Sequence, residues 1–252
     1  MKPFVLISSL LLAFCPPLLF GQTPSSRVLI IGIDGVRSDA HTAANTPNLD
    51  ALMNTGVYSP DALNDDITIS GPGWSSILCG VRSDKHLVVN NSFSGSNYDD
   101  YPSLFQRIEN NYSIVNTVSI CHWAPINDYI VVTDADIIEN VGSDNEVREA
   151  AVDQLENADP HVMFIHLDEV DYAGHGYGFS PNVPQYMSTI EEADTHVGAV
   201  LAALYARPNY TQEDWIVIVT SDHGGVGYSH GGNSMEERNV SFIASGPSVT
   251  PL

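Results

Sequence analysis

The chain has few basic residues. Its 252 residues include only nine Lys and Arg against 31 Asp and Glu, which gives a formal net charge of −22 at pH 7. Because such a chain repels nucleic acids and anionic membranes, the composition argues against a DNA- or RNA-binding role. An anionic substrate would need a local source of positive charge, and bound metal ions are the simplest such source.

The sequence also lacks long hydrophobic runs, apart from one at its start. That run, residues 4–20, is interrupted by two prolines and is short for a membrane span. It follows a basic residue and ends before Gly21, a small residue suited to cleavage, so we expect residues 1–22 to be a signal peptide. A lipoprotein signal at Cys15 is the alternative, although Phe14 is bulky for that motif. The expected location is secreted or periplasmic, with no membrane span once the signal is removed.

Cysteine is scarce as well. Cys79 and Cys121 are the two that remain after removal of the signal. In an oxidising compartment they could form a disulfide. They could equally be two small hydrophobic side chains buried in the core, and the sequence leaves both interpretations open.

What the chain does contain is a regular alternation of strand and helix patterns. With 43% hydrophobic residues it can bury a sizeable core, and its length suits one α/β domain at residues 23–252. Apolar, β-branched runs predict strands at residues 27–33, 112–119, 129–133, 161–167, 214–220 and 239–245. Capped periodic segments predict helices at residues 46–56, 143–158 and 183–206. This alternation predicts a mostly parallel sheet with helices on both faces.

Six Asp and His residues follow the predicted strands, where the sites of parallel sheets form. They are Asp34, Asp171, His175, Asp222, His223 and His230. Taken singly, an Asp after a strand is usually a turn former or helix cap, and a lone His is usually a surface or core residue. Together, carboxylate and imidazole donors suit zinc or manganese. Six ligands are too many for one tetrahedral zinc, and they suit two metal ions about 4 Å apart that stabilise both oxygens of an in-line displacement.

A serine stands on a glycine-rich turn that opens into a predicted helix. Residues 65–86 read DDITISGPGWSSILCGVRSDKH, with Ser70 just before the apolar run. One explanation is that Ser70 caps the helix, as serines often do. The other is that its hydroxyl is a nucleophile, since the glycines keep side chains away and a helix N-terminus attracts anions.

Four segments, in order from Val28 to Gly232, resemble the alkaline phosphatase superfamily, and most closely its type I phosphodiesterase/nucleotide pyrophosphatase branch. The segments are VLIIGIDGVRSD, TISGPGWSSILCGVRSDKHLVVNNSF, FIHLDEVDYAGHGYG and VTSDHGGVGYSHGG. The resemblance implies an alkaline phosphatase-like α/β fold. Because relatives continue beyond the last predicted strand, it also implies a chain truncated at its C-terminal end.

The resemblance assigns a role to each candidate residue. It implies one zinc held by Asp34, Asp222 and His223 together with the nucleophile, and a second zinc held by Asp171, His175 and His230. Ser70 matches the nucleophile, because Pro72 and Gly80 fit the family's frame around it, whereas Thr68 does not. Asn91, with Asn90 as the fallback, matches the residue that holds a phosphoryl oxygen.

The implied function is an exported hydrolase that cleaves phosphodiester or pyrophosphate bonds through a phosphoserine on Ser70. The cofactors would be two Zn²⁺ ions, with manganese or iron as alternatives, and the substrate a small anionic phosphate ester.

Three further observations qualify this function. Gly73 and Trp74 stand where sulfatases carry a polar stretch with Arg, which disfavours sulfate esters, and Gly71 replaces an aromatic residue that would stack on a base. A phosphomonoesterase or phosphonate hydrolase on the same scaffold is an alternative that needs more basic groups, and only Arg82 and Lys85 are close in sequence. A catalytically silent metal-binding exoprotein is the third hypothesis.

Overall fold

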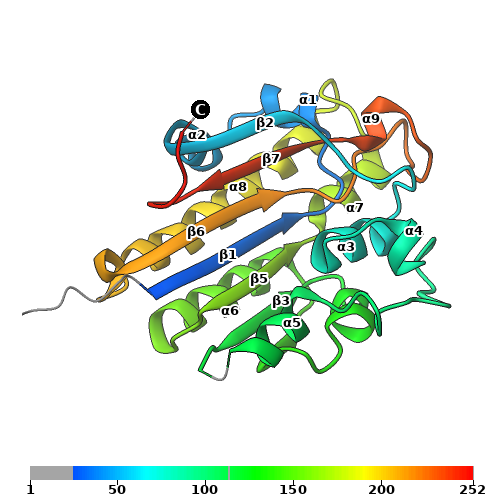
Figure 1. Cartoon of the computed structure of the whole chain (residues 1–252). Helices are drawn as coiled ribbons and strands as arrows, with labels where there is room; N and C mark the ends of the chain where they lie inside the picture. The colour runs from blue at the N-terminus through cyan, green and yellow to red at the C-terminus, as the bar shows by residue number, and fades with distance from the viewer. Residues whose placement is uncertain (1–24, 113, 252) are drawn as a thin grey trace, which may run out of the picture.

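The computed structural model describes residues 25–112 and 114–251, so the expected signal peptide at residues 1–22 lies outside the described residues. The described chain forms a seven-stranded sheet in the order β2-β7-β6-β1-β5-β3-β4 (Figure 1). The strands are β1 (Ser25–Ile33), β2 (Gly56–Leu63), β3 (Thr117–Cys121), β4 (Ile137–Asn140), β5 (Val162–Leu167), β6 (Glu213–Thr220) and β7 (Asn239–Ser245).

Five neighbouring strands, β6, β1, β5, β3 and β4, run parallel to one another. The exception lies at one side of the sheet, where β7 is antiparallel to both β6 and β2. The predicted mostly parallel sheet is therefore confirmed. Parallel pairing also brings the carboxyl ends of β6, β1 and β5 to one edge.

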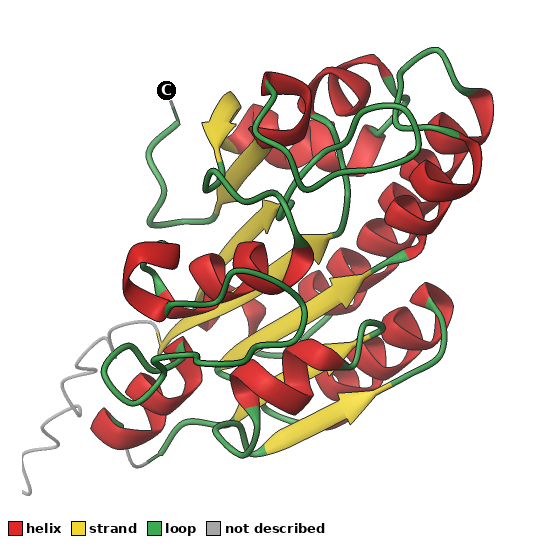
Figure 2. Ribbon diagram, turned by 90° about the vertical axis from the view of Figure 1, so that its right-hand side faces the viewer, coloured by secondary structure: helices red, strands yellow, loops and turns green. Residues whose placement is uncertain are grey.

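Helices cover both faces of the sheet, as predicted (Figure 2). The α-helices are α1 (Ser38–Ala43), α2 (Pro47–Thr55), α3 (Ser70–Cys79), α4 (Ser83–His86), α5 (Leu104–Asn111), α6 (Asp144–Asn157), α7 (Glu169–Tyr177), α8 (Pro184–Tyr205) and α9 (Met235–Arg238). Alternate residues of β1 point to opposite faces. Leu29 and Ile31 pack in a core cluster with α2, α6 and α8, whereas Ile30 packs in a second cluster with α3 and α5.

The prediction of a strand at residues 129–133 is wrong. The chain there forms a π-helix, η1 (Ile126–Val131), and the edge strand is β4. A buried amide explains the difference: Asn127 accepts a hydrogen bond from Ser119 at 2.6 Å and donates to the Glu139 carbonyl at 3.0 Å. These contacts draw η1 onto the sheet as a helical turn that an apolar run alone does not reveal.

The sequence left open whether Cys79 and Cys121 form a disulfide. In the structure both are free and buried, so they fill core positions and are not joined to each other. Among the described residues, no helix combines the length and apolar character needed to cross a membrane.

Candidate active site

The carboxyl edge of the parallel strands gathers the predicted ligands. Asp34 directly follows β1, and Asp222 and His223 follow β6. Because β1 pairs with β6 on one side and β5 on the other, these side chains meet Asp171, which lies in the first turn of α7 just after β5. The topology thus brings together residues that are far apart in sequence.

Asp34, Asp222 and His223 form the first candidate metal group. The three side chains are at most 1% exposed. Nε2 of His223 lies 3.5 Å from Oδ1 of Asp34 and 3.3 Å from Oδ2 of Asp222. Those two carboxylate oxygens are buried without a hydrogen-bond partner, and buried polar atoms of this kind call for a ligand.

Asp171, His175 and His230 form the second group. One helical turn separates Asp171 from His175, whose Nε2 lies 3.3 Å from Oδ2 of the carboxylate. Nε2 of His230 lies 3.6 Å from Oδ1 of Asp171 and 3.1 Å from Nε2 of His175. The rings of His230 and His223 stack with centroids 3.7 Å apart, so the two groups adjoin.

All three imidazoles are oriented by backbone carbonyls. In His223, Nδ1 lies 2.9 Å from the carbonyl oxygen of Gly224. In His230, Nδ1 lies 2.7 Å from the carbonyl oxygen of Thr68, and in His175 it lies 2.9 Å from that of Tyr228. A carbonyl can only accept, so each Nδ1 carries the proton and donates it. Each Nε2 is therefore left with a free lone pair directed into the site, as metal-binding histidines require.

The charges of the two groups fit divalent cations. Burial raises the pKa of Asp34 and of Asp222, and it raises the pKa of Asp171 to about 9. Burial likewise lowers the pKa of His230 to about 3. Crowded carboxylates and neutral imidazoles without a counter-charge are costly to bury, and Oδ1 of Asp171 is a further buried oxygen without a partner. Divalent cations between these groups would satisfy all of them.

Two residues hold the Asp34 carboxylate, and sequence reasoning had assigned neither this role. Nε1 of Trp74 donates to Oδ2 at 2.8 Å, and Nε2 of His166 approaches the same oxygen at 3.1 Å. Trp74 is fully buried, and it lies so close to Gly32 that a Cβ there would come within 2.3 Å of the ring. The indole and imidazole bonds leave Oδ1 free to face the site. No sequence spacing links these three positions.

Ser70 begins α3, and its hydroxyl does not cap the helix. The cap position is Ile69, without a side-chain cap bond, and Oγ of Ser70 lies 3.3 Å from Nε2 of His223. The competing hydroxyl of Thr68 is engaged elsewhere, since it donates to the Gly232 carbonyl at 2.8 Å. Of the two hydroxyls, only that of Ser70 contacts a candidate metal ligand.

Asn91 approaches the start of α3 from a neighbouring loop. Its Oδ1 accepts a hydrogen bond from the backbone N–H of Gly71 at 2.7 Å, which leaves its NH₂ group free to donate. A Cβ at position 71 would lie 2.9 Å from that oxygen and 3.0 Å from the Asn90 carbonyl, so a glycine is needed for this approach. The hydrogen bond from Gly71 thereby fixes the Asn91 side chain next to Ser70, the residue that precedes Gly71 in the chain.

Two of the nearby basic side chains have acidic neighbours. Arg37 pairs with Asp39 at 2.7 Å and donates to the Phe179 carbonyl at 2.9 Å. Lys85 lies 3.9 Å from Asp84 on the surface.

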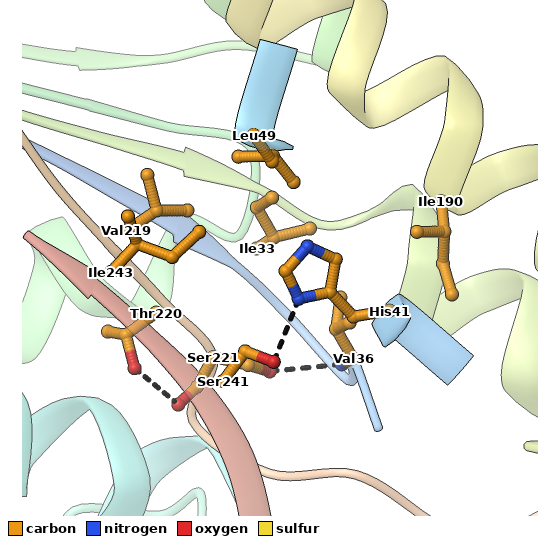
Figure 3. A pocket seen from close by; sticks show the side chains of 10 residues that line it. All are labelled: Ile33, Val36, His41, Leu49, Ile190, Val219, Thr220, Ser221, Ser241 and Ile243. Carbon is orange, nitrogen blue, oxygen red and sulfur yellow. Dashed lines mark hydrogen bonds between the residues drawn. The ribbon is translucent and has the colours of Figure 1, made fainter. Parts of the chain in front are cut away.

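A small apolar cavity adjoins the site. It measures about 20 Å³, room for one water molecule. Val36 and Ser221, which are close in sequence to Asp34 and Asp222, line it together with His41 (Figure 3). Nδ1 of His41 contacts Oγ of Ser241 at 2.8 Å, whereas its Nε2 is buried without a partner.

The sequence matches a known protein family over most of its length. The family model described as type I phosphodiesterase/nucleotide pyrophosphatase matches residues 28–116 and 118–237. An uncharacterized pyrophosphatase/phosphodiesterase of Schizosaccharomyces pombe is 25% identical over 79% of this chain and 44% of its own length. Human bis(5'-adenosyl)-triphosphatase ENPP4 is 26% identical over 79% of this chain and 47% of its own length. The chain thus spans about half the length of these curated relatives.

Solved structures share the fold. Murine ectonucleotide pyrophosphatase/phosphodiesterase 5 superposes with a TM-score of 0.63 at 23% identity, covering 79% of this chain and 57% of its own. A 2-O GAG sulfatase superposes with a TM-score of 0.74 at 18% identity, covering 92% and 66%. The fold is therefore alkaline phosphatase-like, and the matched family model shows that the chain belongs to the type I phosphodiesterase/nucleotide pyrophosphatase family.

Proposed function

We propose that the protein is an exported two-metal hydrolase that cleaves phosphodiester or pyrophosphate bonds through a phosphoserine on Ser70. One observation carries the proposal: buried carboxylate oxygens without partners and three oriented imidazole Nε2 atoms converge beside this hydroxyl. Family membership supports the reaction class. The signal-like pattern of residues 1–22 supports export.

One metal ion would be held by Asp34, Asp222, His223 and the Ser70 oxygen. The other would be held by Asp171, His175 and His230. When bound, divalent cations would favour the ionised serine oxygen and offset the negative charge of the phosphate. The Asp and His donors suit zinc, with manganese and iron as alternatives. Trp74 and His166 would keep the Asp34 carboxylate turned toward its metal.

Ser70 would attack phosphorus in line with the bond to be broken. A bond forms between its Oγ and phosphorus, the bond to the leaving oxygen breaks, and the departing alcohol or phosphate carries away the electron pair. The resulting phosphoseryl ester keeps the second substituent of the diester. Water then attacks phosphorus from the side the leaving group vacated, and Ser70 is released.

The chain would stabilise the transition state with neutral donors. The free NH₂ group of Asn91 would donate to a non-bridging phosphoryl oxygen. The ten-residue helix α3 presents its N-terminus at the same place, where backbone N–H groups favour an anion. Gly71 and Gly73 carry no side chains that would block the phosphate.

Diesters and pyrophosphates fit these residues better than monoesters. A monoester carries an additional charge and calls for extra basic groups, whereas Arg37 is committed to Asp39 and Lys85 lies beside Asp84. An inactive variant of murine ENPP5, 22% identical with a TM-score of 0.63, has been solved in complex with AMP. Nucleoside phosphates are therefore suitable members of the substrate panel.

The test compares Ser70→Ala with Ser76→Ala, a control on the same helix whose hydroxyl donates to the Pro72 carbonyl at 2.9 Å. Bis-p-nitrophenyl phosphate and p-nitrophenyl phosphate report diester and monoester turnover. We expect Ser70→Ala to abolish diester turnover and Ser76→Ala to retain it. Peptide mapping after an acid quench should find Ser70 carrying the p-nitrophenyl phosphoryl group in the wild type and in Ser76→Ala, and no such group in Ser70→Ala.

Two results would redirect the proposal. Full activity of Ser70→Ala would remove the serine from the mechanism. About two bound metal ions per chain, with no turnover of any phosphate ester, would instead favour a silent metal-binding exoprotein.

A further inference from the structure

Thr68 connects the segment that carries the nucleophile to the segment that carries a ligand of the second metal group. It is fully buried and lies two residues before Ser70. Its carbonyl oxygen lies 2.7 Å from Nδ1 of His230. Its hydroxyl donates to the Gly232 carbonyl at 2.8 Å and accepts the backbone N–H of Gly231 at 3.0 Å. Three hydrogen bonds therefore tie this one residue to three consecutive residues of a segment that is distant in the sequence.

These hydrogen bonds complete a closed circuit of contacts around the site. Oγ of Ser70 lies 3.3 Å from Nε2 of His223, whose ring stacks on that of His230 with centroids 3.7 Å apart. His230 in turn reaches the carbonyl of Thr68, which is joined to Ser70 through Ile69 alone. A displacement at Thr68 would consequently change the position of His230 relative to the nucleophile.

The loop beyond His230 has a second, separate anchor. The buried carboxylate of Glu237 accepts the backbone N–H groups of Gly232 and Ser234 at 2.7 and 3.1 Å. This anchor would keep the loop folded if the Thr68 hydroxyl were removed. The effect of removing the hydroxyl would therefore be local, at His230 and the peptide that follows it.

A small displacement of His230 matters because of what a metal ligand requires. A histidine ligand must present Nε2 in a fixed direction, and the group that binds Nδ1 sets that direction. Thr68 binds Nδ1 through its carbonyl, and its hydroxyl fixes the peptide that follows the histidine. A buried N–H or carbonyl that loses its partner costs free energy, so the loop would shift to find another.

We infer that Thr68 is a positioning residue that holds the His230 ligand of the second metal group in place relative to the Ser70 nucleophile, an inference that rests on the proposed function. Thr68 acts through His230 and is assigned no contact with metal or substrate. Its carbonyl belongs to the backbone, so the hydroxyl is the part of this device that a substitution can remove.

Two substitutions separate the hydroxyl from the rest of the side chain. Thr68→Val keeps the shape and removes the hydroxyl, whereas Thr68→Ser keeps the hydroxyl and removes the methyl group. Thr117→Val is the matched control at the start of β3, at the opposite edge of the sheet. Thr117 is also fully buried, and its hydroxyl donates to Oε1 of Glu109 at 2.7 Å and accepts the N–H of Asp136 at 3.0 Å. Both valine variants thus lose one donated and one accepted hydrogen bond.

The first readout is metal binding, which does not depend on turnover. Chelator-treated protein loaded with cadmium-113 should give two NMR signals, and the signal that is lost in His175→Ala belongs to the second group. We expect Thr68→Val to shift or broaden that signal more than the other. The Cd²⁺ affinity of the second group should fall about 10–100-fold, as loss of a partner that orients a metal ligand typically causes. Thr68→Ser and Thr117→Val should resemble the wild type at both sites.

The second readout is turnover of bis-p-nitrophenyl phosphate at saturating Zn²⁺. Thr68→Val should lower kcat about 100-fold, because a misplacement of about 1 Å at the reacting groups has an effect of this size. Thr68→Ser should restore most of the lost rate, and Thr117→Val should leave the rate unchanged. Urea unfolding of the metal-free proteins should show that both valine variants are folded.

A third measurement uses the wild type alone, so it does not depend on the folding of any variant. Nitrogen NMR of the metal-free protein should show the neutral His230 ring protonated at Nδ1, the tautomer that can donate to the Thr68 carbonyl. A neutral ring protonated at Nε2 would overturn the inference.

Other outcomes would also overturn it. Equal effects of Thr68→Val and Thr117→Val on metal binding and turnover would show that Thr68 is only structural, and they would leave the proposed function intact. The same conclusion would follow if Thr68→Ser were as impaired as Thr68→Val. A wild-type protein that binds neither Zn²⁺ nor Cd²⁺ and hydrolyses no diester or pyrophosphate would instead refute the proposed function, and the inference with it.

Discussion

Replacing Trp74 by Phe tests how the first proposed metal group is held. The change removes the indole N–H that donates to Oδ2 of Asp34 at 2.8 Å and leaves His166, at 3.1 Å, as the other side chain on that oxygen. A hydrogen bond to a charged group contributes about 1.5–3 kcal/mol. Loss of a partner that orients a metal ligand typically lowers metal affinity about 10–100-fold. We expect the Zn²⁺ affinity of one of the two sites to fall by that factor.

The assay is calorimetric titration of chelator-treated protein with Zn²⁺, combined with urea unfolding of the metal-free form. Trp215→Phe is the matched control, because Trp215 is 1% exposed and its Nε1 donates to Oε2 of Glu213 at 2.7 Å. Both variants lose a buried indole and one hydrogen bond, so both should lose stability. If Trp74→Phe binds Zn²⁺ as tightly as Trp215→Phe at both sites, Trp74 does not position the ligand.

Three more changes test other parts of the structure. Burial lowers the pKa of His41, so the unfolded chain binds the proton more readily than the folded chain, and the free energy of unfolding should fall as the pH drops below about 6.5. The expected slope is at most about 1.4 kcal/mol per pH unit. Urea unfolding at several pH values should show that His41→Asn lacks this dependence. Asp194→Ala should cost about 1–3 kcal/mol in unfolding free energy, because the buried carboxylate accepts the N–H of Leu49 at 2.8 Å at the start of α2. Gly71→Ala should reduce diester turnover with little loss of bound metal, since its Cβ would meet Oδ1 of Asn91 at 2.9 Å; unchanged turnover would show that this approach is not needed.

The sheet could be predicted where strands are buried on both faces. β1, β5 and β6 appear in the sequence as continuous apolar runs because helices cover both sides of them. β2 (Gly56–Leu63) was missed, since it contains Pro60, which suits only a strand at the edge of a sheet. The π-helix η1 was missed because the bonds of Asn127 come from distant strands.

The convergence of the proposed metal ligands could be predicted because strand ends and residue types together mark them. Asp171 and His175 are one helical turn apart, a spacing visible in the sequence. The partners of Asp34 could not be predicted in the same way. Trp74 and His166 reach that carboxylate from α3 and β5, and a long buried side chain gives no sign in the sequence of which polar group its single N–H meets.

The buried thiols of Cys79 and Cys121 can be used to measure how often the protein core opens to solvent. Burial raises the pKa of Cys79 to about 12 and also raises that of Cys121, so neither reacts as a thiolate while the core is closed. A thiol reagent added at equilibrium would therefore label the domain at the rate at which its interior becomes accessible. Cys79 and Cys121 are not joined by a disulfide, so a reductant breaks no bond between them. The labelling rate can therefore be compared directly between chelator-treated and zinc-loaded samples.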